Sequence, residues 1–99
     1  MIQFDSANKY TITMSGKFKR CIKLAKKRGY NLESLKPIVH SLANDIPLEP
    51  KHRDHQLVGD MNRFRECHVT PDWLLVYEKT GGTLVLYLYA TGTHADILE

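Results

Sequence analysis

The chain has 99 residues, of which 42% are hydrophobic and 25% are charged, ordinary values for one folded domain with a single core. Its formal net charge of +3 is compatible with a polyanionic partner but does not require one. This composition excludes a largely disordered chain, and no apolar run approaches the roughly 20 residues that span a bilayer.

Cys21 and Cys67 are the two cysteines, and the N-terminal residues lack the basic region and apolar run of a secretory signal. Two thiols without such a signal are typical of a reducing compartment rather than of a disulfide-bonded secreted domain. We therefore expect a cytoplasmic protein without a membrane segment, formed by a single domain over residues 1–99.

The first third of the chain predicts a strand followed by a helix. Apolar and polar residues alternate from Tyr10 to Met14, which indicates a strand. Ser15 then offers an N-cap, and apolar residues recur at helical spacing as far as Ala25. Gly29 is a natural C-cap, because it follows a basic run that suits the negative end of the helix dipole.

A second helix is predicted by the apolar stripe that runs from Leu35 to Leu42. If Ser34 is its N-cap, Pro37 takes the third helical position, where its missing N–H matters little. If Asn31 is the cap, Pro37 removes an interior hydrogen bond. We therefore favour Ser34, with an irregular turn before it, and expect the two helices to form an antiparallel pair.

The second half of the chain predicts strands joined by tight turns, after a segment over residues 45–60 that is mostly loop. Three strands are expected at Arg63–Val69, Trp73–Glu78 and Thr83–Tyr89, with turns at 70–72 and 80–82 and at most one helical turn at His94–Leu98. The order β-α-α-β-β-β predicts an α+β fold, in which a helical hairpin packs on one face of a mainly antiparallel sheet. The other face stays partly open.

Four residues with acid–base side chains are expected at the strand ends and loops around this open face: His55, His68, Asp72 and His94. Cleaving RNA without a metal needs a base for the 2′-hydroxyl proton, an acid for the departing 5′-oxygen, and cations to stabilise the phosphorane. Histidine suits the first two roles because its ordinary pKa of about 6.5 lets both protonation states exist near neutrality. Arginine and lysine suit the third.

Structural interpretations compete with this chemistry. Asp72 fits a simple turn residue, and Trp73 at the head of a strand is more often core than a base-stacking platform. A zinc site is a further alternative, but no pair of ligands has the close spacing of common zinc sites. Cys67 and His68 are adjacent on a predicted strand, so they point to opposite faces and do not easily share a metal.

Seven basic residues crowd into the first predicted helix and its end: Lys17, Lys19, Arg20, Lys23, Lys26, Lys27 and Arg28. They form either the solvated face of an amphipathic helix or a surface that meets RNA phosphates through salt-sensitive contacts. Two more cations, Arg53 and Arg65, flank the histidine region and are candidates for binding the substrate.

Four ordered motifs carry a resemblance to a known family. They are Asp54-His55-Gln56-Leu57, Arg65-Glu66-Cys67-His68-Val69, Pro71-Asp72-Trp73-Leu74-Leu75-Val76-Tyr77 and Thr91-Gly92-Thr93-His94. In order and spacing these motifs resemble the YafQ branch of the RelE-like toxins. The likeness covers nearly the whole chain after the first predicted strand.

The resemblance implies a RelE-like fold and a toxin that enters the ribosomal A site and cleaves the mRNA there without a cofactor. It also implies an antitoxin partner that silences the toxin, and operator DNA that is bound only through the toxin–antitoxin complex. By motif, the catalytic residues are His55, His68, Asp72 and His94, while Trp73 supports the substrate or stacks near it.

Two departures from the family pattern concern the end of the chain. Members usually carry arginine immediately before the TGTH motif, where this chain has Ala90, and often phenylalanine where it has Leu98. An arginine at the scissile phosphate is a major source of transition-state stabilisation. We therefore hypothesise that Ala90 attenuates the activity. This leaves two alternatives for the chain, a non-catalytic module that binds RNA or a partner, and the regulatory half of a DNA-binding toxin–antitoxin complex.

Overall fold

The computed structural model describes residues 2–98 and shows a five-stranded sheet in the order β1-β5-β4-β3-β2. The strands are β1 (Thr11–Met14), β2 (His55–Gln56), β3 (Arg65–Thr70), β4 (Trp73–Thr80) and β5 (Val85–Gly92). Only β1 and β5 pair in parallel, and the other neighbours are antiparallel. The mainly antiparallel α+β fold is therefore confirmed.

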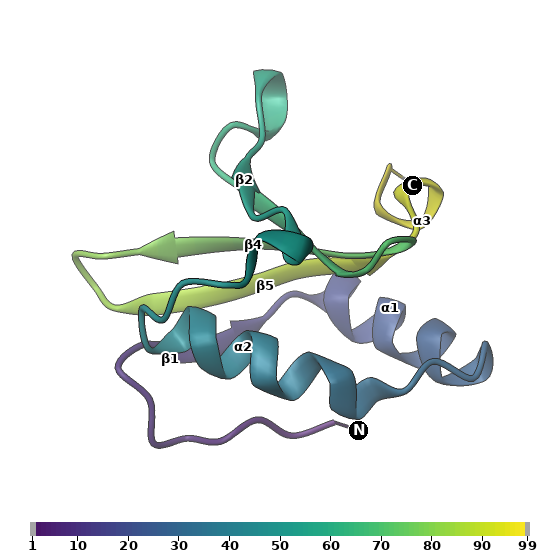
Figure 1. Ribbon diagram of the computed structural model, residues 1–99, viewed down its shortest axis with the longest axis horizontal. Coiled ribbons are helices and arrows are strands. Elements are labelled where there is room, and N and C mark those ends of the chain that lie inside the picture. The colour runs from purple at the N-terminus through teal and green to yellow at the C-terminus, as the bar shows by residue number, and fades with distance from the viewer. Residues whose placement is uncertain (1, 99) are drawn as a thin grey trace.

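The helices lie on both sides of this sheet. They are α1 (Gly16–Lys27), α2 (Leu35–Ala43) and α3 (His94–Leu98), with short 3-10 segments η1 (Leu32–Ser34), η2 (Pro50–His52) and η3 (Gly59–Met61). In Figure 1, α1 and α2 lie below the sheet, whereas α3 and the segment around β2 stand above it. None of the helices in the described part of the chain combines the length and hydropathy needed to cross a bilayer.

The predicted helix caps are largely confirmed. The Ser15 hydroxyl accepts a hydrogen bond from the Phe18 N–H (2.8 Å), and Gly29 follows α1 in the left-handed conformation that favours glycine. The helix α2 begins directly after Ser34, but Ser34 makes no side-chain cap. Asn31 instead caps η1, so the two candidate caps mark the starts of two successive helices.

Two strand predictions are corrected. The segment expected to be loop contains β2, a two-residue strand that pairs with β3. The last hairpin turn is longer than predicted, because Thr80 pairs with Val85 and Leu84 takes a positive φ of 53°. As a result β5 begins two residues later than expected and runs on to Gly92.

Each face of the sheet carries its own core. The larger core fills the space between the sheet and the helices α1 and α2, and its fully buried members include Phe18, Leu35, Val39, Leu75, Leu86 and Leu88. The smaller core lies on the opposite face and consists of Cys21 from the edge of α1 together with Phe64, Leu74, Val76, Ala90 and Ile97. We call this second face the open face, because the buried residues of α1 and α2 pack mainly in the larger core.

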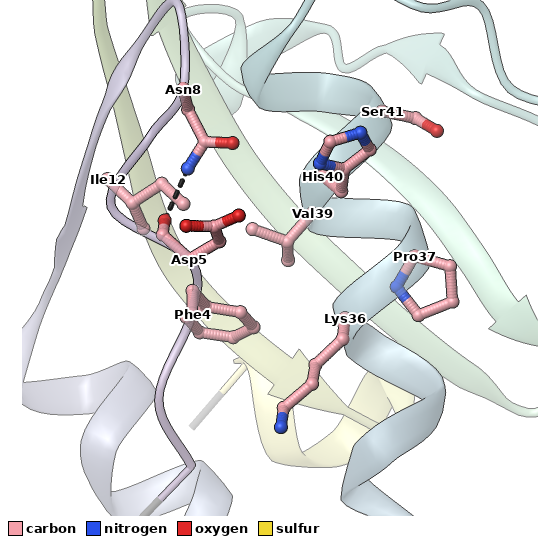
Figure 2. A pocket seen from close by; sticks show the side chains of 9 residues that line it. All are labelled: Phe4, Asp5, Asn8, Ile12, Lys36, Pro37, Val39, His40 and Ser41. Carbon is pink, nitrogen blue, oxygen red and sulfur yellow. Dashed lines mark hydrogen bonds between the residues drawn. The ribbon is translucent and has the colours of Figure 1, made fainter.

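A pocket of about 390 Å³ lies between the N-terminal segment and α2. Figure 2 shows Phe4, Asp5 and Asn8 on one side of it and Lys36 and His40 of α2 on the other. None of the four predicted acid–base residues is among its lining residues in the described part of the chain. The candidate site is therefore a separate place on the open face.

Candidate active site

One row of opposed residues crosses the open face from β2 to β5. His55 pairs with Glu66, Glu66 pairs with Val76, and Val76 pairs with Ala90. Residues directly opposite one another in an antiparallel sheet project to the same face. The row therefore places a predicted catalytic histidine next to a carboxylate, and the position of the expected arginine one strand further on, beyond Val76.

Glu66 joins two of the predicted histidines. Its Oε1 atom lies 3.5 Å from Nε2 of His55 and 4.0 Å from Nε2 of His94, although its side chain is only 9% exposed. A carboxylate this buried is stable only with polar or cationic partners. Each of the two imidazoles becomes a cationic partner for this carboxylate when it is protonated.

The tautomer of His55 follows from its other ring nitrogen. Nδ1 lies 2.6 Å from the carbonyl oxygen of Arg53, and because a carbonyl only accepts, Nδ1 must donate. The Nε2 atom that faces Glu66 is then the basic nitrogen of a neutral ring. Arg53 itself takes a left-handed conformation (φ 45°) and is exposed beside His55.

The residue before His55 is anchored from the helix side of the sheet. The Tyr77 hydroxyl donates to Asp54, and Arg65 Nε lies 3.3 Å from that hydroxyl and 3.4 Å from Asp54 Oδ1. Burial, reinforced by Asp54, raises the pKa of Tyr77 well above its usual range. Tyr77 therefore stays a hydroxyl donor, and this network fixes the segment that carries His55.

His94 is held by a capping arrangement at the start of α3. The Thr93 N–H donates to Asp96 Oδ2 (2.9 Å), and the Asp96 N–H donates to Thr93 Oγ1 (3.3 Å), the reciprocal pattern of a capping box. Gly92 (φ +134°) allows the close approach, because a Cβ there would lie 2.6 Å from Asp96 Oδ2. The entry to α3 thus depends on glycine and on one carboxylate.

Two cations of α1 and its C-cap brace α3. Arg28 binds both carboxylate oxygens of Asp96 at 2.6 and 3.2 Å, and this pairing lowers the pKa of Asp96. Lys17 donates to the carbonyl of Ile97. Two of the seven basic residues predicted to meet RNA therefore contact α3, while Lys19, Arg20, Lys23, Lys26 and Lys27 are exposed.

His68 and Asp72 lie beside this cluster rather than in it. His68 is two residues beyond Glu66 on β3 and shares its face, and its Nδ1 donates to the Pro71 carbonyl (3.2 Å). His52 of η2 contacts the backbone carbonyl of His68 through Nδ1 (2.6 Å). Asp72 is exposed in the β3–β4 turn, and among the described residues no hydrogen bond or ion pair links it to a histidine.

Two predicted substrate contacts lie on the helix side of the sheet. Trp73 is 5% exposed, and its indole N–H donates to Thr91 (2.8 Å) while its ring packs against Tyr30. Trp73 is therefore a core residue, and its indole is not open to stack on a substrate. Arg65 is engaged with Asp54 and Tyr77, because strand alternation points it away from Glu66.

The two departures from the family pattern occupy different environments. Ala90 is fully buried in the small core of the open face, next to Val76 in the row that leads to Glu66. Leu98 is 82% exposed and lies four residues after His94 in α3, so both side chains share one helix face.

Glu66 is the candidate site residue that the sequence interpretation missed. The signal was present, because a charged residue two positions before His68 on a strand must share its face. No three His, Cys, Asp or Glu side chains among residues 2–98 are arranged to hold a metal ion. Cys67 is buried, which raises the pKa of its thiol to about 12 and makes it unsuitable as a nucleophile.

The fold and the site together define a class, a small α+β protein with a histidine–carboxylate cluster on the sheet face opposite its two long helices. The family described as "Bacterial toxin of type II toxin-antitoxin system, YafQ" matches residues 10–99, and the chain belongs to this family. This confirms the resemblance read from the four motifs.

Curated and solved relatives agree with this assignment. The mRNA interferase toxin YafQ of Escherichia coli K12 is 39% identical over 98 residues, which are 98% of both chains. YafQ in the E. coli DinJ–YafQ toxin–antitoxin complex is 36% identical with a TM-score of 0.81, over 92% of this chain and 99% of that one. A metal-bound toxin from Helicobacter pylori is 41% identical with a TM-score of 0.84, over 89% and 98%.

Proposed function

We propose that this chain is a toxin endoribonuclease that cleaves mRNA in the ribosomal A site by acid–base chemistry, without a metal or cofactor. The observation that carries the proposal is the Glu66 carboxylate between the Nε2 atoms of His55 and His94. Its relatives that are named mRNA interferase toxins support the reaction class. The site of action would be the cytoplasm, where ribosomes translate.

His55 is the proposed base. Its Nδ1 proton is fixed on the Arg53 carbonyl, so Nε2 is free to take the proton of the 2′-hydroxyl. The 2′-oxygen then attacks phosphorus, and the bond from phosphorus to the 5′-oxygen breaks. The products are a 2′,3′-cyclic phosphate and a 5′-hydroxyl. Glu66 stabilises the imidazolium that forms on His55.

His94 is the proposed acid. Its side chain is 74% exposed, so it can reach the departing 5′-oxygen of a strand that lies across the open face and can regain a proton from solvent. Its proton goes to that oxygen, which balances the proton taken by His55. His68 and Asp72 are proposed to position the phosphate and share proton transfer from the neighbouring end of β3, and exposed Arg53 is proposed to pair with the phosphate.

The exposed basic residues of α1 are proposed to contact ribosomal RNA phosphates: Lys19, Arg20, Lys23, Lys26 and Lys27. Such contacts are insensitive to sequence and weaken as salt rises. Lys17 and Arg28 are proposed to act on ribosomal RNA only secondarily, since both also contact α3.

A cognate antitoxin is the proposed protein partner, as in the E. coli DinJ–YafQ complexes. Operator DNA would be bound only through that complex. A second function, a module that binds RNA or a partner without cutting, is favoured by one observation, the fully buried Ala90 at the position of the expected arginine.

The test is to strip the purified protein of any bound metal with EDTA, remove the chelator, add treated and untreated protein to a translating extract, and map the mRNA ends by primer extension. We expect codon-phased cuts that survive chelation and that disappear in the His94→Ala and His55→Ala proteins. Cuts that vanish with EDTA contradict the metal-independent mechanism. Ribosome or RNA binding without any cut supports the non-catalytic alternative.

A further inference from the structure

A bulge in β5 places two consecutive residues, Tyr89 and Ala90, on the open face next to the candidate site. Val76 pairs with Ala90 while Tyr77 pairs with Leu88, so Tyr89 is an extra residue between two regular pairs. The Ser15 hydroxyl donates to the carbonyl of Tyr89 and holds the bulge (2.5 Å). Bulges of this kind re-aim side chains and are common beside active sites.

Tyr89 is part of an aromatic group on this face. Its ring stacks on Phe64 with centroids 4.5 Å apart and planes at 24°, and Tyr87 lies 6.5 Å from it. Phe64 is buried, whereas both tyrosines are half-buried. The group therefore rests on the small core through Phe64 and presents the two tyrosines to solvent.

Cations flank this aromatic group. The Arg63 guanidinium lies 4.9 Å from the centroid of Phe64, and Lys17 Nζ lies 5.4 Å from that of Tyr89. The Arg63 side chain is 60% exposed and is held by Glu78 at 2.9 Å. Half-exposed aromatic rings on a sheet face, with cations beside them, are the arrangement that binds single-stranded RNA by base stacking and phosphate contact.

We propose that Tyr87 and Tyr89 form a base-stacking subsite for the single-stranded RNA that crosses the open face, with Arg63 beside it for the backbone phosphate. Tyr89 adjoins Ala90, whose row leads through Val76 to Glu66. The subsite is thus continuous with the histidine–carboxylate cluster and would hold a nucleotide flanking the cleaved bond. The subsite rests on the proposed function. It would stack on the base, the role expected of Trp73, whose ring is buried.

The test measures binding of the intact protein to a short single-stranded 2′-O-methyl RNA, which lacks the nucleophilic 2′-hydroxyl and is not cut. Tyr87→Leu and Tyr89→Leu keep apolar packing but remove the ring, and we expect each to weaken binding about fivefold to a hundredfold. The matched variants Tyr87→Phe and Tyr89→Phe keep the ring and should bind like the parent. Thermal unfolding of all four variants checks that the fold is retained.

An abasic substitution makes the same test from the RNA side. Removing the base that stacks should weaken binding to the parent and have little further effect on the leucine variants, since interacting partners are not additive. Equal loss in the leucine and phenylalanine variants, unchanged binding in the leucine variants, or a parent that does not bind the oligonucleotide each overturns the subsite. Loss of antitoxin binding with RNA binding intact identifies the face as a protein interface instead and also overturns it.

Cleavage by the parent in a translating extract, measured in parallel, separates this proposal from the proposed function. If the parent does not cut but the leucine variants still lose RNA binding, the subsite is supported and the nuclease proposal fails. If the parent cuts and the leucine variants bind RNA as the parent does, the nuclease proposal stands and the subsite fails.

Discussion

His55 and His94 both lie near the same carboxylate oxygen of Glu66, but the protein holds them by different means. The segment of His55 is anchored by Tyr77, a residue that is 1% exposed and whose hydroxyl donates to Asp54. His94 begins a five-residue helix whose fixed points are the Asp96 cap and the surface ion pair from Arg28.

We call the first the buried anchor because its donor, the Tyr77 hydroxyl, is buried and neutral, and the second the surface anchor because its donor, Arg28, is charged and 39% exposed. A hydrogen bond from a buried neutral hydroxyl is little affected by salt, whereas an ion pair with a partly exposed arginine is screened by it. We therefore expect the position of His55 to be insensitive to solution conditions and that of His94 to depend on salt and pH.

Glu66→Gln removes the negative charge that lies near both histidines. Holding His55 and His94 in position should then no longer promote cleavage. We expect cleavage in a translating extract to fall by about 10²- to 10⁴-fold, the usual contribution of positioned acid–base groups. Glu33→Gln, an exposed carboxylate on η1, is the matched control and should cut as the parent does. Cleavage at the parent's rate by Glu66→Gln would show that the Glu66 carboxylate has no role in the reaction.

Ala90→Arg tests whether the site lacks a cation, because members of the family usually have arginine at this position. Because Ala90 lies in the row that leads to Glu66, the guanidinium is expected to reach the phosphate and raise cleavage by about 10²- to 10³-fold. The site is fully buried, so the larger side chain should lower the free energy of unfolding by about 1–3 kcal/mol.

Ala90→Leu adds bulk without charge and separates these two effects. It should destabilise the protein to a similar degree, measured by chemical denaturation, without raising cleavage. If Ala90→Arg leaves the cleavage rate unchanged while the protein stays folded, Ala90 does not attenuate this toxin.

The contrast between the two anchors also marks what the sequence could predict. Periodicity located α1, α2 and the three long strands, because apolar residues recur at the spacing of each element. The strand β2 was missed because two exposed residues, His55 and Gln56, carry no such pattern. Their pairing is decided by β3, a partner distant in sequence.

The site shows the same limit. The motifs identified His55, His68 and His94. That Glu66 lies between His55 and His94 depends on the alternation of side chains along β3 and on the pairing of distant strands. Trp73 and Arg65 were assigned to the substrate because they neighbour the catalytic motifs, yet adjacent strand residues project to opposite faces. Their burial and contacts put them on the helix side.

Tyr77→Phe removes the hydroxyl of the buried anchor and keeps the ring. We expect unfolding to require about 1 kcal/mol less, and cleavage to fall about tenfold because the His55 segment loses its fixed position. The loss should be the same at low and high salt. Tyr10→Phe is the control, since the Tyr10 hydroxyl makes no hydrogen bond in the described part of the chain. Equal effects of the two variants would contradict the anchoring role.

Arg28→Gln and Asp96→Asn remove the surface anchor of His94, and each should slow cleavage only a few-fold at low salt. Lys27→Gln, an exposed neighbouring cation, is the control for a general loss of charge on this helix. The double variant Arg28→Gln with Asp96→Asn completes a mutant cycle: if the ion pair itself matters, its loss should be smaller than the sum of the two single losses. A loss equal to that sum would indicate that Arg28 acts apart from Asp96, as in a contact to RNA phosphate.

The stabilisation from the Arg28–Asp96 ion pair should change with pH in a defined direction. Because Arg28 lowers the pKa of Asp96 in the folded protein, the ion pair stabilises the fold above the ordinary aspartate pKa of about 3.9, and this contribution disappears as the pH falls through the lower folded value. Arg28→Gln should therefore unfold at a lower temperature than the parent at neutral pH and match it in strong acid. Tyr77→Phe leaves the Arg28–Asp96 pair intact, so its deficit relative to the parent should not disappear as Asp96 is protonated. Coincident pH profiles for the two variants would erase the distinction between the anchors.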